Sequence, residues 1–509
     1  MPDFTPMPAP LAGLPPGAAR RAGRAADAPG PGLRRRPSSA PRDWRTLLLA
    51  CFALWLAGCT ALPAPTVPLA KPDALGGYRF GHAARAPDNS SSLFVVLTFS
   101  GGGTRAAALA YGVLEELSRV EVQWEGRRRR LLDEVDLVSA VSGGSVTAAY
   151  LALKGERIFE DFESRFLHRD VEGELILKLF DPRDWSRMLL PSFGRSDLVA
   201  EHLDQLLFEG ATYGALLSRP GPFVIVSATD MAAGTRFEFI QDQFDLMCTD
   251  LARFPLSRAV AASAAVPVVL SPIVVQSHAD RCPPPDLSSF ERARREGRLS
   301  SRQMHQVDKL QSYLDATERR YIHLLDGGLS DNLGLRSPLE AVFLRDGAWS
   351  LAQRIGIADV RKVVFVVVHA STGSELSWNR TAELPGLVEM LRAVKDIPID
   401  RYSFETKELL AASFERWADD VKRQRKLAGD AAGEDLEFVM VDVDFGALSD
   451  RAERDALMQV PTTWSLDADT VARIRRAAGT LLGESRAFQE LLRSLDATRR
   501  EPASVPAAH

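Results

Sequence analysis

The stretch LLDEVDLVSAVSGGSVTAAYLAL, residues 131–153, joins an apolar run of strand type to a helix-forming run through a turn of small residues. Ser142 stands at that turn between Val141 and Gly143, where no bulky neighbour shields its hydroxyl. A nucleophile on a tight strand-to-helix turn needs small neighbours so that substrate can approach it. The stretch therefore predicts a strand, a turn that presents Ser142, and a helix that follows.

The same arrangement occurs upstream, where the apolar run Leu93–Phe99 leads into three glycines and an alanine-rich helix. A charged, hairpin-like patch at Glu125–Arg130 separates the two units. Strand, helix, strand, helix implies an α/β fold with a mostly parallel central sheet flanked by helices in three layers. Further strands are predicted at Phe223–Asp230, Ile322–Asp326, Val363–His369 and Phe438–Val443.

Composition is that of a globular protein with a sizeable core. The 509 residues are 46% hydrophobic and 25% charged. A net charge of -5 gives no reason to expect a nucleic-acid partner. The length fits a single large α/β domain with insertions as well as several average domains.

The first 58 residues predict a basic leader followed by a signal peptide. The first 45 positions contain eight arginines and three acidic residues. The apolar run Thr46–Cys59 that follows is too short to span a bilayer, but its length fits the apolar core of a signal peptide. Its end, LAGC, resembles the bacterial lipobox, in which the cysteine, here Cys59, receives diacylglycerol. The alternative is a buried thiol in an anchor helix. Threonine after Cys59 favours the outer membrane over the inner, facing the periplasm.

Residues 59–92 are rich in proline, alanine and serine, and predict a linker that holds the globular part off the membrane. Beyond it, Cys248 and Cys282 are compatible with a disulfide in an oxidising compartment or with two free thiols. Their spacing offers no metal-ligand pattern.

Two further clusters of small residues end predicted strands, where open parallel sheets place their ligands. Gly101–Gly103 offers unshielded N–H groups at a helix N-terminus, which suits an oxyanion. The alternative, a phosphate-binding loop, lacks the Lys-Ser/Thr ending and the GxGxxG spacing. Asp326 ends a strand before two glycines and is a candidate base for Ser142; a turn cap is the alternative.

Together these residues resemble the patatin-like phospholipase family. SGGGTR (100–105) is similar to the family's DGGGxR oxyanion loop, AVSGG (140–144) to its GxSxG elbow, and LDGG (325–328) to its DGG/A motif. FVIVSATDMAAGTR (223–236) and AVAASAAVPVVLSP (259–272) resemble two further blocks in the family's order. This sequence departs from the pattern at Ser100, which replaces aspartate, and at Ala140, which replaces the first glycine of the elbow.

The resemblance implies a serine lipid acyl hydrolase of phospholipase A or lysophospholipase type, working through an acyl-serine intermediate with no metal or cofactor. It makes Ser142 the nucleophile and Asp326 its base. It implies that the glycine loop stabilises the oxyanion and that Arg105 supports that loop, while the strand-turn-helix setting adds the N–H of Gly143. The predicted oxyanion hole thus comprises Gly101, Gly102, Gly103, Arg105 and Gly143.

Two other functions remain open at this stage. His369 follows Asp326 at a strand end, and the order Ser, Asp, His is that of α/β-hydrolase esterases. The other is a lipid-anchored binding or scaffold protein of the same fold without turnover.

Two segments are compatible with membrane contact or with ordinary structure. Phe180–Phe193 places aromatic and aliphatic residues beside arginines, which suits a lipid interface or a buried helix. The charged, helical insertion at about 283–320 is expected either to cover the cleft that holds Ser142 and Asp326 or to form only a solvated part of the surface. The domain plan is a catalytic core at 93–345, a C-terminal α/β extension at 346–495 that completes it, and a tail at 496–509. The sequence does not set the oligomeric state.

Overall fold

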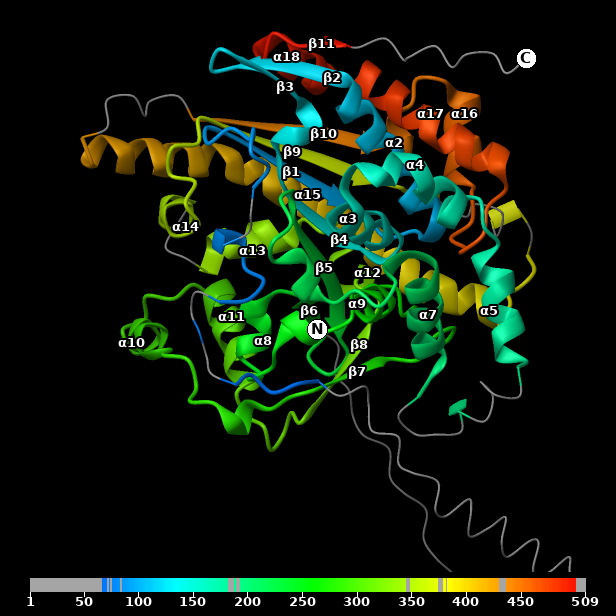
Figure 1. The fold of residues 1–509 in the computed structure, drawn as a ribbon, viewed down its shortest axis with the longest axis horizontal. Helices are drawn as coiled ribbons and strands as arrows, with labels where there is room; N and C mark the ends of the chain where they lie inside the picture. Colours follow the sequence, from blue (N-terminus) through cyan, green and yellow to red (C-terminus); the bar gives the residue numbers. More distant parts are fainter. Residues whose placement is uncertain are drawn as a thin grey trace, which may run out of the picture. The chain divides into compact units, whose positions relative to one another are not determined.

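The computed structural model describes residues 66–70, 73, 76–82, 85–181, 187–188, 193–344, 348–373, 379–380, 382–429 and 436–499. The predicted leader, signal peptide and Cys59 lie outside these ranges, as does much of Phe180–Phe193. Within them, helices surround a central sheet, shown in Figure 1.

In the described part of the chain the central sheet has eight strands in the order β10-β9-β1-β4-β5-β8-β7, with β6 paired to β5. The pairings from β10 to β5 are parallel, and those of β6, β7 and β8 are antiparallel. The strands are β1 (Leu93–Phe99), β4 (Val135–Val141), β5 (Phe223–Asp230), β6 (Thr235–Glu238), β7 (Ile273–Gln276), β8 (Tyr321–Leu325), β9 (Lys362–His369) and β10 (Glu437–Asp444). The mostly parallel α/β prediction is confirmed.

The helices fill the connections between strands. They are α2 (Gly103–Arg119), α3 (Ser142–Lys154), α4 (Ile158–Phe162), α5 (Val171–Leu179), α7 (Arg195–Leu203), α8 (Gln241–Asp245), α9 (Leu256–Ser263), α10 (Ser288–Arg295), α11 (Ser301–Ser312), α12 (Gly328–Asp331), α13 (Arg336–Leu344), α14 (Ala348–Arg354), α15 (Leu387–Leu427), α16 (Arg451–Met458), α17 (Ala468–Glu484) and α18 (Arg486–Ser494). None of the helices in the described ranges is both long and apolar enough to cross a membrane.

The core lies on both faces of the parallel strands. Every residue of β1, β4, β5 and β9 is buried, as expected for strands covered on two sides. On one face, the Phe414 ring of α15 stacks on Phe365 of β9 and Phe438 of β10, with centroids 5.6 and 5.1 Å away. Helix α2 packs between the sheet and α17.

The charged patch between β1 and β4 forms a separate small sheet, as its sequence predicts. Strands β2 (Val120–Trp124) and β3 (Arg127–Arg130) make an antiparallel hairpin. Strand β11 (Thr498–Arg499) pairs with β2, so the predicted tail begins with residues that belong to the fold.

The predicted linker at 59–92 is wrong for its described residues. Pro68 forms a β-bridge with Thr249, and Tyr78 is buried, with its hydroxyl bound to the backbone of Val224 in β5. Arg79 is buried and pairs with Asp245. Its prolines, alanines and serines are typical of a linker, but the few apolar and charged side chains among them are enough to pack the described part of this segment against the domain.

The C-terminal extension at 346–495 supplies β9 and β10, the two strands beyond β1. The insertion at about 283–320 contains the helices α10 and α11. The structure joins Cys248 to Cys282 by a disulfide, with the two Cα atoms 5.7 Å apart. This bond ties the start of the insertion to the segment that follows α8.

Candidate active site

Ser142 lies at a sharp turn between β4 and α3. Its backbone φ is 49°, in the left-handed region that side chains other than glycine rarely adopt. Its N–H donates to Ser263 Oγ at 2.8 Å, and Ser263 Oγ donates to the Ser227 carbonyl of β5 at 2.6 Å. The strained turn is therefore held by a hydroxyl from the neighbouring strand–helix unit, as strain at functional sites requires.

The two glycines after Ser142 allow α3 to approach the glycine loop closely. A Cβ on Gly143 would lie 2.0 Å from the Gly103 carbonyl oxygen, and one on Gly144 would lie 2.7 Å from the Ser100 carbonyl oxygen. Any larger residue at either position would push the elbow away from the loop.

Asp326 faces Ser142 from the end of β8. Ser142 Oγ donates to Asp326 Oδ2 at 2.8 Å, and the Gly328 N–H donates to Oδ1 at 2.8 Å. The Asp326 backbone is fixed as well, because its N–H donates to Ala265 and its carbonyl accepts from Thr229 Oγ1. Both residues of the pair are buried: Ser142 is 6% exposed to solvent and Asp326 is 8% exposed.

Burial sets the basicity of Asp326. It raises the pKa of this carboxyl, against the opposing effects of the Gly328 N–H, the Ser142 hydroxyl and the charge of Lys395 on α15. A raised pKa makes the carboxylate a better proton acceptor for a serine hydroxyl than an ordinary aspartate.

The glycine loop supplies fewer donors than the sequence predicts. The Gly101 N–H donates to the Asn332 carbonyl at 3.0 Å, so Gly101 has no donor left for an oxyanion, and this part of the prediction is wrong. In the described part of the chain, the N–H groups of Gly102, Gly103 and Gly143 have no hydrogen-bond partner within the protein. These three remain the candidate donors.

Arg105 braces the loop from behind. Its buried guanidinium donates to the Val460 carbonyl and, at 3.2 Å, to Thr462 Oγ1, and burial lowers its pKa to about 10. The Thr104 N–H donates to the Thr463 carbonyl at 2.8 Å, which lies so close to Gly103 that a Cβ there would be 2.3 Å away. Arg105 thus supports the loop through residues 460–463, and does not donate into the site.

His369 has a different partner. Its Nδ1 lies 2.8 Å from Asp444 Oδ2, and Ser371 Oγ and Lys407 also donate to that carboxylate. Burial would raise the pKa of Asp444, but His369 and Lys407 together hold it well below its usual range. The structure therefore pairs Ser142 with Asp326, and His369 with Asp444.

Sequence reasoning missed three residues around the pair. Ser263 Oγ accepts the Ser142 N–H, and the backbone carbonyl of Asn332 accepts the Gly101 N–H. Lys395 places a positive charge near Asp326. Ser263 belongs to the block at 259–272, and Asn332 follows the LDGG motif by four residues, but Lys395 lies far along the chain in a segment without a motif.

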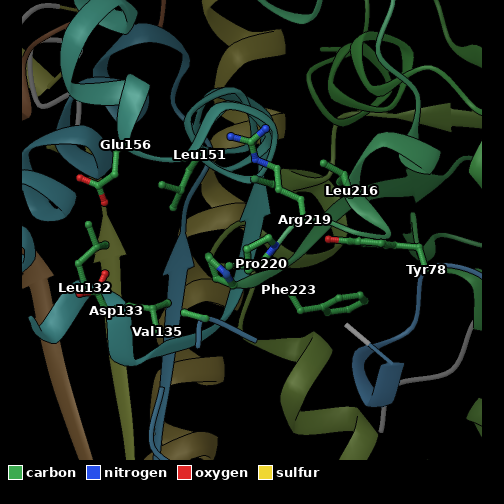
Figure 2. A pocket seen from close by; sticks show the side chains of 15 residues that line it. Tyr78, Leu132, Asp133, Val135, Leu151, Glu156, Leu216, Arg219, Pro220 and Phe223 are labelled. Atoms are coloured by element: carbon green, nitrogen blue, oxygen red, sulfur yellow. The ribbon is translucent and has the colours of Figure 1, made fainter. Parts of the chain in front are cut away.

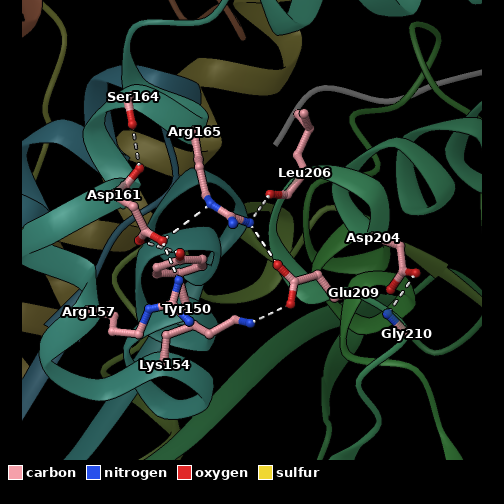
Figure 3. Close-up of polar contacts among 10 residues, drawn as sticks. All are labelled: Tyr150, Lys154, Arg157, Asp161, Ser164, Arg165, Asp204, Leu206, Glu209 and Gly210. Carbon is pink, nitrogen blue, oxygen red and sulfur yellow. Dashed lines mark hydrogen bonds and ion pairs between the residues drawn. The ribbon is translucent and has the colours of Figure 1, made fainter.

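Helix α3 is anchored at its far end by a network of charged and polar groups, shown in Figure 3. Tyr150 Oη donates to Asp161 Oδ1 at 2.6 Å, and Lys154 and Arg165 both bind Glu209 at 2.8 Å. The Lys154 and Arg165 hydrogen bonds lower the pKa of Glu209 to about 2. These contacts tie α3 to α4, which contains Asp161, and to Glu209 at the end of the helical turn Asp204–Phe208.

A cavity of about 170 Å³ lies at the opposite end of the sheet, shown in Figure 2. Its lining includes Val135 and Phe223, the first residues of β4 and β5, together with Tyr78. Ser142 follows the last residue of β4, which is roughly 20 Å farther along a seven-residue strand. The cavity is therefore separate from the Ser142–Asp326 pair.

A family model described as "Patatin-like phospholipase" matches residues 97–339, the span that carries the elbow, the glycine loop and Asp326. Residues 97–339 form a patatin-like phospholipase domain. The match places the patatin-like domain among hydrolases of lipid acyl esters, the enzyme class that the motifs predict. No curated protein matches the chain.

Solved structures resemble the chain only distantly. Human GIVD cytosolic phospholipase A2 is 13% identical with a TM-score of 0.39, and the match covers 80% of this chain and 60% of the human one. VipD from Legionella pneumophila is 11% identical with a TM-score of 0.27, covering 81% of this chain and 68% of that one. The chain thus spans about 60% of the length of the human phospholipase.

Proposed function

We propose that the chain is a membrane-anchored serine lipid acyl hydrolase in which Ser142 and Asp326 form a catalytic dyad. The hydrogen bond of 2.8 Å between Ser142 Oγ and Asp326 Oδ2, on a strained turn beside free backbone N–H groups, carries the proposal. The patatin-like domain supports an acyl ester of a lipid as the substrate class.

In the first half-reaction Ser142 Oγ attacks the ester carbonyl carbon and its proton passes to Asp326 Oδ2. Negative charge develops on the carbonyl oxygen, where the N–H groups of Gly102, Gly103 and Gly143 would stabilise it. The C–O bond of the ester then breaks, and Asp326 returns the proton to the leaving alkoxide. The products of this half-reaction are the alcohol and an acyl-serine.

In the second half-reaction a water molecule takes the place of the alcohol. Asp326 accepts a proton from the water, the hydroxide attacks the acyl carbonyl, and the bond to Ser142 Oγ breaks. Ser142 regains its proton and the fatty acid leaves. Both half-reactions need the same carboxylate as base and then as acid, which a buried aspartate of raised pKa suits.

We also propose that Cys59 is acylated at the lipobox-like LAGC and anchors the chain in the bacterial cell envelope, in the outer membrane facing the periplasm. Mass spectrometry of the mature N-terminus tests this directly. A diacylglyceryl adduct on Cys59 is the expected result, and an unmodified or uncleaved N-terminus would contradict it.

The test of the dyad compares fatty-acid release from phospholipid vesicles by the full chain and by Ser142→Ala, Asp326→Asn and His369→Ala. We expect the first two variants to lose about a thousandfold or more in rate, and His369→Ala to keep its dyad, because His369 binds Asp444. Equal loss in His369→Ala would favour the Ser-Asp-His esterase. No release by the wild type from any lipid class would favour the scaffold function.

A further inference from the structure

Three groups of apolar side chains on the domain surface are exposed to solvent. The first lies on the amino-terminal part of α15, the second at the carboxyl end of α5, and the third in the loop after α9. They are Leu387, Met390, Leu391, Val394 and Ile397; Ile176, Leu177 and Phe180; and Val268 and Val269. Val394, Phe180 and Val268 are 71%, 79% and 72% exposed, which is unusual for apolar side chains that recur on one helix face.

The apolar residues of α15 recur every three or four positions, so they lie on one face of the helix. Farther along the same helix, Ser403, Thr406 and Leu410 form the buried face. Successive residues of an α-helix are rotated by about 100° around its axis. The exposed apolar residues of α15, which form a stripe centred on Val394, therefore lie on nearly the opposite side of the helix from these buried positions. In its first three turns α15 therefore directs its apolar face away from the protein, the reverse of a helix that packs on a core.

The inward side of this part of α15 carries charges toward the site. Lys395 acts on Asp326, and Asp396 and Asp400 act on Arg105 behind the glycine loop. Helix α12, which begins two residues after Asp326, packs against α15. The exposed stripe is thus the outer side of a helix whose inner side borders the Ser142–Asp326 pair.

The other two groups are connected to the site through neighbouring residues. The loop with Val268 and Val269 follows Ala265, whose carbonyl accepts the Asp326 N–H at 2.9 Å. At the start of α5, the Glu172 carboxylate accepts a hydrogen bond from Thr463 Oγ1, and the Thr463 carbonyl accepts the Thr104 N–H of the glycine loop. In Figure 1, α5 and the start of α15 lie toward the same side of the domain.

Chain length places a membrane within reach of these groups. Seven residue steps separate Cys59 from Thr66, a span of at most about 25 Å when fully extended. Thr66 is buried and donates to the Gln276 carbonyl at the end of β7, and β7 begins four residues after Val269. An acyl anchor on Cys59 would therefore keep the bilayer surface within about 25 Å of Thr66, and the loop that carries Val268 and Val269 leads into the other end of β7.

We propose that these three groups form a docking face that seats the domain on a phospholipid bilayer, with the Ser142–Asp326 pair opening toward the lipid. The inference rests on the proposed function, since it explains how an acyl chain reaches a serine that is only 6% exposed. Burying the three groups in the interface removes apolar surface from water, and gives the acyl chain an apolar path to the site.

The docking test uses the full chain with Ser142→Ala, so that the vesicles stay intact and binding is measured apart from turnover. A single cysteine at Leu391→Cys or at Leu427→Cys carries an NBD fluorophore, and unsubstituted chain labelled in parallel gives the background. Leu427 is a matched control because it is 77% exposed on the same helix, about 54 Å farther along. The protein is reconstituted in phosphatidylethanolamine–phosphatidylglycerol vesicles that contain doxyl-labelled lipid.

We expect the probe at position 391 to shift to shorter wavelength and to be quenched by the doxyl lipid, while the probe at 427 stays in water. Equal behaviour of the two probes would overturn the docking face, because the acyl tether alone would then explain membrane association. A blue shift at 391 that depends on protein concentration without vesicles would overturn it in favour of an interface between copies of the chain.

Activity gives an independent readout. In the active full chain, Leu391→Asp with Val394→Asp should lower the rate on vesicles relative to the rate on a soluble short-chain ester by about tenfold, because the charges must be dehydrated at the interface. Leu427→Asp should leave that ratio unchanged. An unchanged ratio in the double variant overturns the docking face while the hydrolase stands. If the wild type hydrolyses neither substrate, the proposed function fails, and the fluorescence result still decides the docking face.

Discussion

At the residue scale, the site depends on where the backbone comes close. Ala140, which replaces the first glycine of the elbow pattern, lies inside β4, with Phe99 and Val226 as its strand neighbours. The close approaches fall at Gly143 and Gly144 instead, where glycine is present. Alanine at 140 is therefore compatible with the turn that gives Ser142 its φ of 49°.

Asp326 and Asp444 should respond to substitution in opposite ways. Burial raises the pKa of Asp326 in the folded protein above its pKa in the unfolded chain. The carboxyl therefore lowers the stability of the protein as the pH rises from the unfolded pKa through the folded pKa. Burial opposes ionisation of Asp444 too, but His369 and Lys407 hold its pKa low, so its contribution to stability is present near neutral pH and lost on acidification.

Urea unfolding at pH 8 and pH 4 measures this difference. We expect Asp326→Asn to raise the free energy of unfolding more at pH 8 than at pH 4, while abolishing fatty-acid release. Asp444→Asn should lower the free energy of unfolding at pH 8, with less effect at pH 4. The same sign for both variants at pH 8 would contradict the assignment of a destabilising buried base.

At the element scale, a buried carboxylate at the end of β5 binds the segment that follows the insertion's helix α11. Asp230, the last residue of β5, is fully buried and accepts hydrogen bonds from Tyr313 Oη at 2.7 Å and from Arg319. The Arg319 guanidinium also lies over the Tyr313 ring, 4.2 Å from its centroid. The chain after α11 thus returns to the sheet at a defined point, just before β8 brings Asp326 to the site.

Removing the positive partner should destabilise the protein strongly. We expect Arg319→Met to cost about 2–4 kcal/mol in the free energy of unfolding, because it leaves Asp230 buried with its main charge partner missing. Arg294→Met is the control, because the Arg294–Asp308 pair is exposed and should be worth less than about 0.5 kcal/mol. Urea denaturation compares the two variants, and equal costs would show that Asp230 needs no such partner.

At the scale of the whole molecule, the patatin-like domain at 97–339 shares its sheet with residues beyond the match. Strand β1 is paired on both sides, with β4 and with β9, and β9 lies beyond the match. The glycine loop is held by residues 460–463 through Thr104 and Arg105. Removing the extension would expose a hydrophobic edge strand and release the loop.

We therefore expect a chain that ends at residue 345 to be insoluble or inactive, and a chain that ends at residue 499 to match the full chain. Soluble expression, far-ultraviolet circular dichroism and fatty-acid release measure the outcome. A soluble, cooperatively unfolding and active chain ending at 345 would show that β9 and β10 are dispensable.

The sequence by itself determined the local units. Short apolar runs predicted β1, β4, β5, β8, β9 and β10 within one or two residues. The signal was clearest for β1, β4, β5 and β9, because strands buried on both faces need an uninterrupted apolar run. The same small-residue clusters marked Ser142, Asp326 and the glycine loop, since only small residues permit such tight turns.

Only the tertiary structure decided which of these groups meet. It paired Ser142 with Asp326 and left His369 to Asp444, because β8 returns antiparallel beside β5 while β9 lies on the other side of β1. In the structure the Gly101 N–H is bound to Asn332 and is no longer an oxyanion donor. The described residues after Thr66 pack on the domain, and the first turns of α15 expose their apolar face. These features depend on contacts between residues that are far apart in the chain. A local pattern of side chains does not predict such contacts.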